Sequence, residues 1–135
     1  MQTNFKLFCL ALPIIIAFDA SWIGVIAGGF YHDNLGPILL PHPNLLAALA
    51  FYVIYVVGII FFALRPALQA HSLAKAVMYG AMLGLVSYAT CDLTNVAAVQ
   101  GWPVIIAVVD MAWGVILTGV VSGLTYVLAT KVFKI

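Results

Sequence analysis

The chain has 135 residues, of which 66% are hydrophobic and 7% are charged, whereas an ordinary soluble domain has about 45–50% apolar and about 25% charged residues. This composition predicts an integral membrane protein. Five basic residues and a formal net charge of +1 cannot make a surface that follows a phosphate backbone, which excludes nucleic-acid binding. At about 20 residues per span, the length predicts one transmembrane domain, residues 1–135, with four spans.

The first predicted span covers residues 5–30. Its basic start is typical of a signal peptide, but Asp19 and Trp22 occupy the region where a cleavage site requires small residues, and the apolar stretch is too long. We therefore expect a retained helix. Pro13 is tolerated within it, because neighbouring helices and side chains can satisfy the carbonyl that proline frees.

The segment that follows, residues 31–43, contains three prolines and a glycine, which rule out a continuous helix. Its Ile-Leu-Leu run is too apolar for a freely solvated loop, so we expect it to dip into the membrane interface or lie over the mouth of the bundle. His32, Asp33 and His42 are weak candidates for a metal site there. Their spacing matches no zinc signature, and solvated loop histidines are the commoner alternative.

Three further spans complete the predicted architecture. The second, residues 44–64, is expected to end before Arg65 and Pro66, since proline does not continue an established helix. The third covers residues 74–96 and the fourth covers residues 103–132. The chain is thus predicted to be an all-α, four-helix membrane bundle.

The basic residues predict the orientation of these spans. All of them lie at the start of the first span, beside the second connection or at the end of the fourth span, and none falls in the other two connections: Lys6, Arg65, Lys75, Lys131 and Lys134. Cytoplasmic segments of membrane proteins are enriched in Lys and Arg. Both termini are therefore predicted to be cytoplasmic.

Three aspartates interrupt the apolar spans. Asp19, Asp92 and Asp110 lie in the first, third and fourth spans, each in the outer half of the membrane under the predicted orientation. A charged side chain at the centre of a membrane helix costs at least about 2.5–3.5 kcal/mol, so such residues face the bundle interior and find partners. We expect the fold to bring the three carboxyl groups together.

Polar and aromatic side chains share helix faces with these aspartates. Tyr88, Asp92 and Asn95 follow an i, i+4, i+7 spacing, and an Asp-x-x-Trp spacing occurs in both the first and the fourth span. An indole N–H is a donor that suits a carboxylate of its own or a neighbouring helix. Two tyrosines of the second span, Tyr52 and Tyr55, are three residues apart and so share a helix face. The candidate ligand-binding residues are therefore Asp19, Trp22, Tyr52, Tyr55, Tyr88, Asp92, Asn95, Asp110 and Trp113.

Three carboxylates in a low dielectric cannot all be ionised without a compensating cation, and no basic residue lies at their depth. Either some are protonated, or a metal ion or organic cation lies among Asp19, Asp92 and Asp110. This favours a protein that binds or transports a cation, proton or small ligand. The alternatives are a membrane-embedded enzyme that modifies a lipid or apolar substrate by carboxylate acid–base chemistry, and a structural or assembly subunit whose aspartates only join helices.

The sequence contains no phosphate loop, nucleophile–histidine arrangement or haem-attachment motif, so it assigns neither catalytic residues nor cofactors. Cys9 and Cys91 lie in separate apolar segments, which argues against a disulfide. Small-xxx-small patterns at Gly24–Gly28, Gly80–Gly84 and Gly119–Gly123 predict close helix packing, within the chain or in a homodimer.

Several of these motifs occur together in one known family. They are Asp19-x-x-Trp22, Phe51-Tyr52-x-x-Tyr55, Tyr88-x-x-x-Asp92-Leu-Thr-Asn95, Trp102-Pro103 and Asp110-x-x-Trp113-Gly114. In this combination the chain resembles, over essentially its whole length, a bacterial family of small four-span membrane proteins, the domain of unknown function two-one-seven-seven. The resemblance implies a four-helix inner-membrane protein, and it implies no activity.

Overall fold

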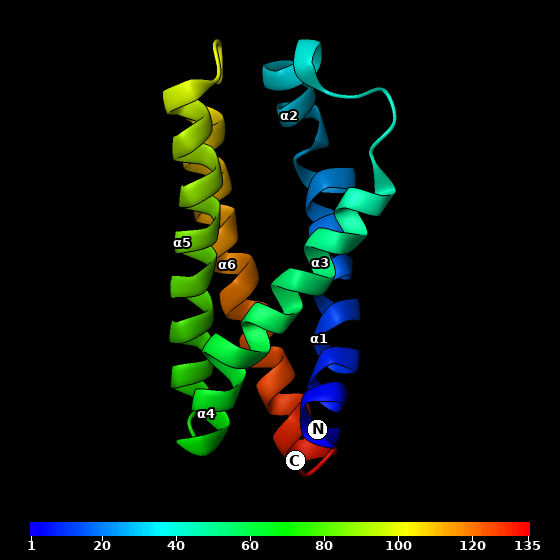
Figure 1. Cartoon of the computed structure of the whole chain (residues 1–135), viewed down its shortest axis with the longest axis vertical. Coiled ribbons are helices and arrows are strands. Elements are labelled where there is room, and N and C mark those ends of the chain that lie inside the picture. Colours follow the sequence, from blue (N-terminus) through cyan, green and yellow to red (C-terminus); the bar gives the residue numbers. More distant parts are fainter.

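The computed structural model describes all 135 residues. It contains helices and no strands, and four helical segments are long and apolar enough to cross a membrane (Figure 1). These segments are Gln2–Ile26, Leu45–Gln69, Leu73–Ala98 and Val104–Val132. The predicted all-α, four-span architecture is therefore confirmed.

The first span consists of a long helix and a π-helical turn, and two short helices follow it: α1 (Gln2–Ser21), η1 (Trp22–Ile26), α2 (Gly28–Leu35) and the 3₁₀ turn η2 (Gly36–Ile38). Where the sequence predicted one helix to Phe30, the α-helix ends at Ser21 and the π-helical turn at Ile26, and the backbone of Ala27 then leaves the helical region at φ −114° and ψ 1°. The turn is tight, because a Cβ atom at Gly28 would meet the carbonyl oxygen of Ile23. The break lets α2 begin in a new direction.

The second span continues through the proline that was expected to end it. Its parts are α3 (Leu45–Ile59), the π-helical turn η3 (Ile60–Leu64) and α4 (Arg65–Gln69). In a regular helix, the ring of Pro66 would clash with the carbonyl four residues earlier. The wider π-helical turn lies directly before it and places Pro66 in the first turn of α4, where proline is tolerated.

The third and fourth spans form a closely packed antiparallel pair: α5 (Leu73–Ala98), and α6 (Val104–Val127) with the π-helical turn η4 (Leu128–Val132). A Cβ atom on Gly80 would meet Ser122, and one on Gly84 would meet the backbone of Gly114. Gly119 lies against Ala81. Two of the three small-xxx-small patterns are thus used between α5 and α6 within one chain, and the homodimer stays a prediction.

The two ends of the bundle differ. Both chain termini and α4 lie at one end in Figure 1, which we call the termini end, and α2 and the α5–α6 connection lie at the other, the loop end. The main cluster of buried apolar side chains lies toward the termini end and includes Leu7, Ile15, Ile59, Leu64, Leu117 and Val121. Large apolar side chains such as Leu46 and Ile54 are exposed on the outside, where they suit contact with lipid.

The charged residues are divided between these ends. All Lys and Arg residues lie in or beside the helix ends at the termini end, whereas the four aspartates lie in the other half of the molecule. The cytoplasmic placement of the termini end rests on the positive-inside rule and stays a prediction.

Candidate ligand-binding site

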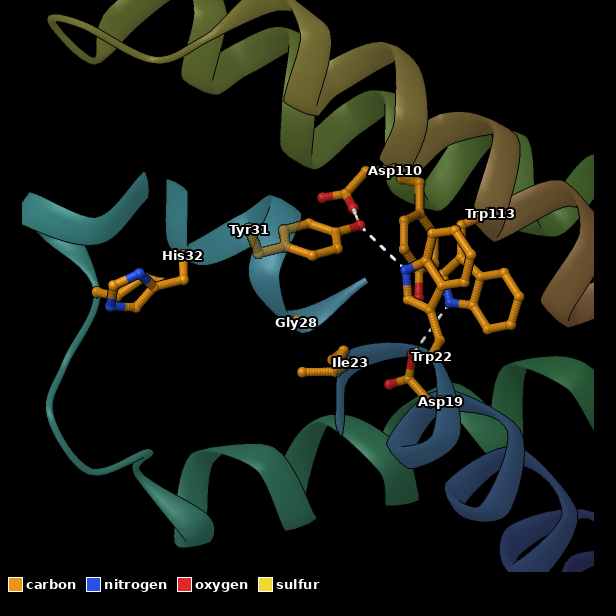
Figure 2. Close-up of a pocket in the computed structure, with 10 residues that line it drawn as sticks. Asp19, Trp22, Ile23, Gly28, Tyr31, His32, Asp110 and Trp113 are labelled. Carbon is orange, nitrogen blue, oxygen red and sulfur yellow. Dashed lines mark hydrogen bonds between the residues drawn. The ribbon is translucent and has the colours of Figure 1, made fainter. Parts of the chain in front are cut away.

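The first cavity lies toward the loop end, between the first span, α2 and the α5–α6 pair (Figure 2). Its volume is about 420 Å³, within the range of about 300–1,000 Å³ that is usual for small-molecule sites. It combines aromatic rings with two carboxyl groups, and no Lys or Arg lines it. The lining residues are Asp19, Trp22, Ile23, Gly28, Tyr31, His32, Leu39, Tyr88, Asp110 and Trp113.

Asp19 of α1 is held by donors from two other spans. Its Oδ2 accepts a hydrogen bond from the Tyr52 hydroxyl of α3 at 2.5 Å, and its Oδ1 accepts one from the Trp113 indole of α6 at 3.1 Å. The side chain is 6% exposed. Asp19 therefore joins three of the four spans, and both of its oxygens have partners.

A second set of hydrogen bonds, centred on Asp110, lies beside the set that holds Asp19. Trp22 donates from Nε1 to the Tyr31 hydroxyl at 3.2 Å, and that hydroxyl donates to Oδ1 of Asp110. Figure 2 shows both links. The indoles of Trp22 and Trp113 stack, with ring centroids 4.3 Å apart and an interplanar angle of 8°. The two sets of hydrogen bonds therefore meet at this pair of rings.

The two Asp-x-x-Trp pairs are thus crossed between helices. Trp113 bonds Asp19 of the first span directly, and Trp22 reaches Asp110 of the fourth span through Tyr31. Neither indole bonds the aspartate three residues before it. The repeated spacing places each indole where it can serve the opposite helix.

Tyr31 was not among the predicted site residues, although it connects α2 to Asp110. The segment around it was expected to be a loop, because glycines and prolines flank it. The signal that was available is the apolar character of this segment, which predicted that it lies over the bundle mouth. Tyr31, His32 and Leu39 do line the cavity. Burial, followed by the hydrogen bond to Asp110, raises the pKa of Tyr31 above its ordinary value of 10.0.

A second cavity, of about 280 Å³, lies next to the first. Asp92 and Asp110 both line it, and its walls are Phe51, Ser87, Tyr88, Cys91, Asp92 and Asp110. Asp92 is 2% exposed, and its Oδ1 has no hydrogen-bond partner. The buried indole nitrogen of Trp102 also has none. Asp110 and Tyr88 therefore belong to both cavities.

Tyr88 of α5 lines both cavities. Its ring lies where a Cβ atom on residue 114 would be, so Gly114 of α6 makes room for it. The same ring meets Tyr55 edge-on, with centroids 6.5 Å apart. The Tyr88 phenol thus belongs to the walls of both cavities, as Asp110 does.

The remaining predicted residues lie outside both cavities. The Tyr55 hydroxyl shares a hydrogen bond of 2.7 Å with Thr118, deeper in the bundle. Asn95 lies one turn beyond Asp92, and its amide is 3.9 Å from the Cys91 sulfur. Tyr52 reaches the first cavity only through Asp19.

The metal-site candidates do not form one cluster. No group of three or more His, Cys, Asp or Glu side chains is arranged to hold a metal ion. His32 lines the first cavity at the end away from the stacked indoles (Figure 2), whereas Asp33 and His42 are exposed and line neither cavity. Asp110 is the aspartate shared by the two cavities; Asp19 lines only the first and Asp92 only the second.

Comparison with known proteins adds one match. A family model described as "Predicted membrane protein (DUF2177)" matches residues 4–127. No curated protein and no solved structure matches the chain.

Proposed function

The chain belongs to the DUF2177 family of membrane proteins, and we propose that it binds a small organic cation in its first cavity. The observation that carries this proposal is the composition of the cavity wall. Two carboxyl groups, Asp19 and Asp110, lie beside a stacked pair of indoles, with no Lys or Arg among the lining residues.

The charge of the wall favours a cationic ligand. A carboxylate removed from water favours its neutral form unless an opposite charge lies within about 4–6 Å. Around Asp110 the only polar partner with a hydrogen bond is the Tyr31 hydroxyl, which is neutral. A bound cation supplies the charge that the chain itself lacks at this depth.

The aromatic rings favour an organic cation over a metal ion. Trp22, Trp113, Tyr31 and Tyr88 line the same space, and a cation over an aromatic face gains about 0.5–1 kcal/mol at an exposed site and about 2 kcal/mol when desolvated. Metal ions need several converging oxygen, nitrogen or sulfur ligands. Alkylated ammonium groups instead suit a wall of aromatic rings beside one carboxylate.

The helix-joining alternative has its strongest support at Asp19. Because both of its oxygens accept hydrogen bonds from other spans, Asp19 is needed to hold α1, α3 and α6 together whether or not a ligand binds. Asp110 is different, since only one of its oxygens has a hydrogen bond and it faces two cavities. We therefore assign the main ionic contact to Asp110.

The test is a binding titration of the purified protein in detergent micelles. Choline and tetraalkylammonium ions from tetramethyl to tetrapropyl are added at constant ionic strength, and tryptophan fluorescence is followed because two of the three indoles line the cavity. We expect a saturable change with at least one of these cations. The uncharged isostere of choline, 3,3-dimethylbutan-1-ol, should give none.

Two variants of matched charge complete the test. Asp110→Asn should weaken binding by about tenfold or more, the equivalent of about 1.4 kcal/mol. Asp33→Asn removes an exposed carboxylate outside both cavities and should bind as the wild type does. Absence of saturable binding by the whole series, equal binding of the isostere, or unchanged binding by Asp110→Asn would overturn the proposal.

A further inference from the structure

The second cavity contains a carboxyl pair of which the proposed cation site uses only one member, Asp110. Asp92 comes from α5 and Asp110 from α6, and both line this cavity. Asp110 also lines the first cavity. Any charge placed next to Asp110 in the first cavity therefore acts on the pair in the second.

Asp92 lacks the partners that an ionised carboxylate needs. It is 2% exposed, and its Oδ1 has no hydrogen-bond partner. By contrast, Asp19 has a donor for each oxygen. A buried carboxyl group without donors is accommodated when it carries a proton, because the O–H can then donate to a neighbouring acceptor.

The groups around the pair offer no positive charge. The titratable side chains near Asp92 and Asp110 are Tyr88 and Cys91 on α5, Tyr31 on α2 and Asp19 on α1. All of these are neutral or acidic, and no Lys, Arg or His lines the second cavity. Two adjacent carboxyl groups in such surroundings cannot both be ionised unless a cation compensates them, so they share a proton.

We infer that the Asp92–Asp110 pair holds one exchangeable proton and that a cation bound in the first cavity displaces it. The inference rests on the proposed function. Before binding, the pair carries one proton and one negative charge. After binding, both carboxylates are ionised, the organic cation lies beside Asp110, and the proton has left for the aqueous phase. One cation enters as one proton leaves, and the net charge of the site stays the same.

The exchange makes cation binding pH-dependent. Below the pH at which the pair loses its proton, the affinity for choline, or for the tetraalkylammonium ion that binds best, should strengthen about tenfold for each unit of rising pH. Adding that cation to weakly buffered protein with an indicator dye should release up to one proton for each cation bound. Asp92→Asn leaves a single carboxylate, so it should bind the cation without releasing a proton and with an affinity that no longer depends on pH.

Each outcome has a distinct meaning. If no cation binds at any pH, the proposed function fails. If the wild type binds but releases no proton, or if Asp92→Asn releases as many protons as the wild type, the exchange is wrong while the proposed function stands.

Infrared spectroscopy tests directly whether the Asp92–Asp110 pair carries a proton before any cation is added. Infrared spectroscopy of the wild type near neutral pH should show the C=O band of a protonated carboxyl group, and this band should disappear on adding the bound cation. Asp33→Asn should retain it. A wild-type spectrum without the band would overturn the inference, even if Asp92→Asn does not fold.

Discussion

The indole N–H of Trp113 in α6 lies 3.1 Å from Oδ1 of Asp19 in α1, although Trp113 is only three residues from an aspartate of its own helix. Trp22, which is three residues from Asp19, stacks on Trp113 and points its N–H at Tyr31 instead. The two similar indoles therefore have different tasks. Trp113 satisfies a buried carboxylate directly, and Trp22 supports a hydroxyl that is already bonded to Asp110.

This difference predicts unequal effects of the same substitution. Trp113→Phe leaves Oδ1 of Asp19 buried without a donor, which costs about 1–3 kcal/mol of unfolding free energy. Trp22→Phe removes one donor from Tyr31 and leaves the Tyr31–Asp110 hydrogen bond in place, so its cost should be smaller. Both variants lose a similar amount of stacking area. Unfolding of the two purified variants in detergent, followed by circular dichroism, compares them, and equal losses would contradict the assignment.

The contact between α5 and α6 predicts a second contrast, between two glycines. A Cβ atom on Gly84 would overlap the backbone of Gly114, so Gly84→Ala must push the helices apart and should cost about 1–3 kcal/mol. Gly58 of α3 has nothing within 4 Å of its Cβ position, so Gly58→Ala should be neutral or stabilise the helix by up to about 1 kcal/mol. Titration of both variants with a denaturing detergent measures the difference. Similar midpoints for the two would show that the α5–α6 contact is looser than described.

Tyr31 lies outside the four spans and predicts a loss of stability at alkaline pH. Burial and the hydrogen bond to Asp110 raise the pKa of Tyr31 above its ordinary 10.0, so the folded chain keeps a proton that an unfolded chain loses. The stability from this difference is complete below pH 10.0 and declines as the pH rises toward the raised pKa. Between neutral pH and about pH 11, the unfolding temperature of the wild type should therefore fall more than that of Tyr31→Phe. Parallel curves would contradict this.

The sequence was sufficient to predict the four spans, because long apolar runs and their polar connections depend on composition alone. It was less informative about how the helices continue. Pro66 was expected to end the second span, yet a π-helical turn lets the helix pass through it. A π-helical turn depends on local packing as well as residue type, so the residue pattern of the second span did not predict it.

For the site, depth along each span predicted which polar residues lie at similar heights, and Asp19, Trp22, Asp110 and Trp113 do line one cavity. Helical spacing identifies side chains on one face but not the helix opposite, so the crossed pairing of indoles and aspartates could not be predicted. Asn95 shows the same limit, since it follows the spacing of Tyr88 and Asp92 yet lies outside both cavities. Tyr31 was missed because its helix is only eight residues long and is bounded by glycines.

The two partners of Asp19 become available at different times during synthesis. Tyr52 follows Asp19 by 33 residues and arrives with the next span, whereas Trp113 follows it by 94 residues and arrives with the last. Chains emerge with the N-terminal part first, so Trp113 cannot reach Asp19 before the fourth span has been made. Both the second hydrogen bond of Asp19 and the indole stack therefore depend on the fourth span being in place beside the first.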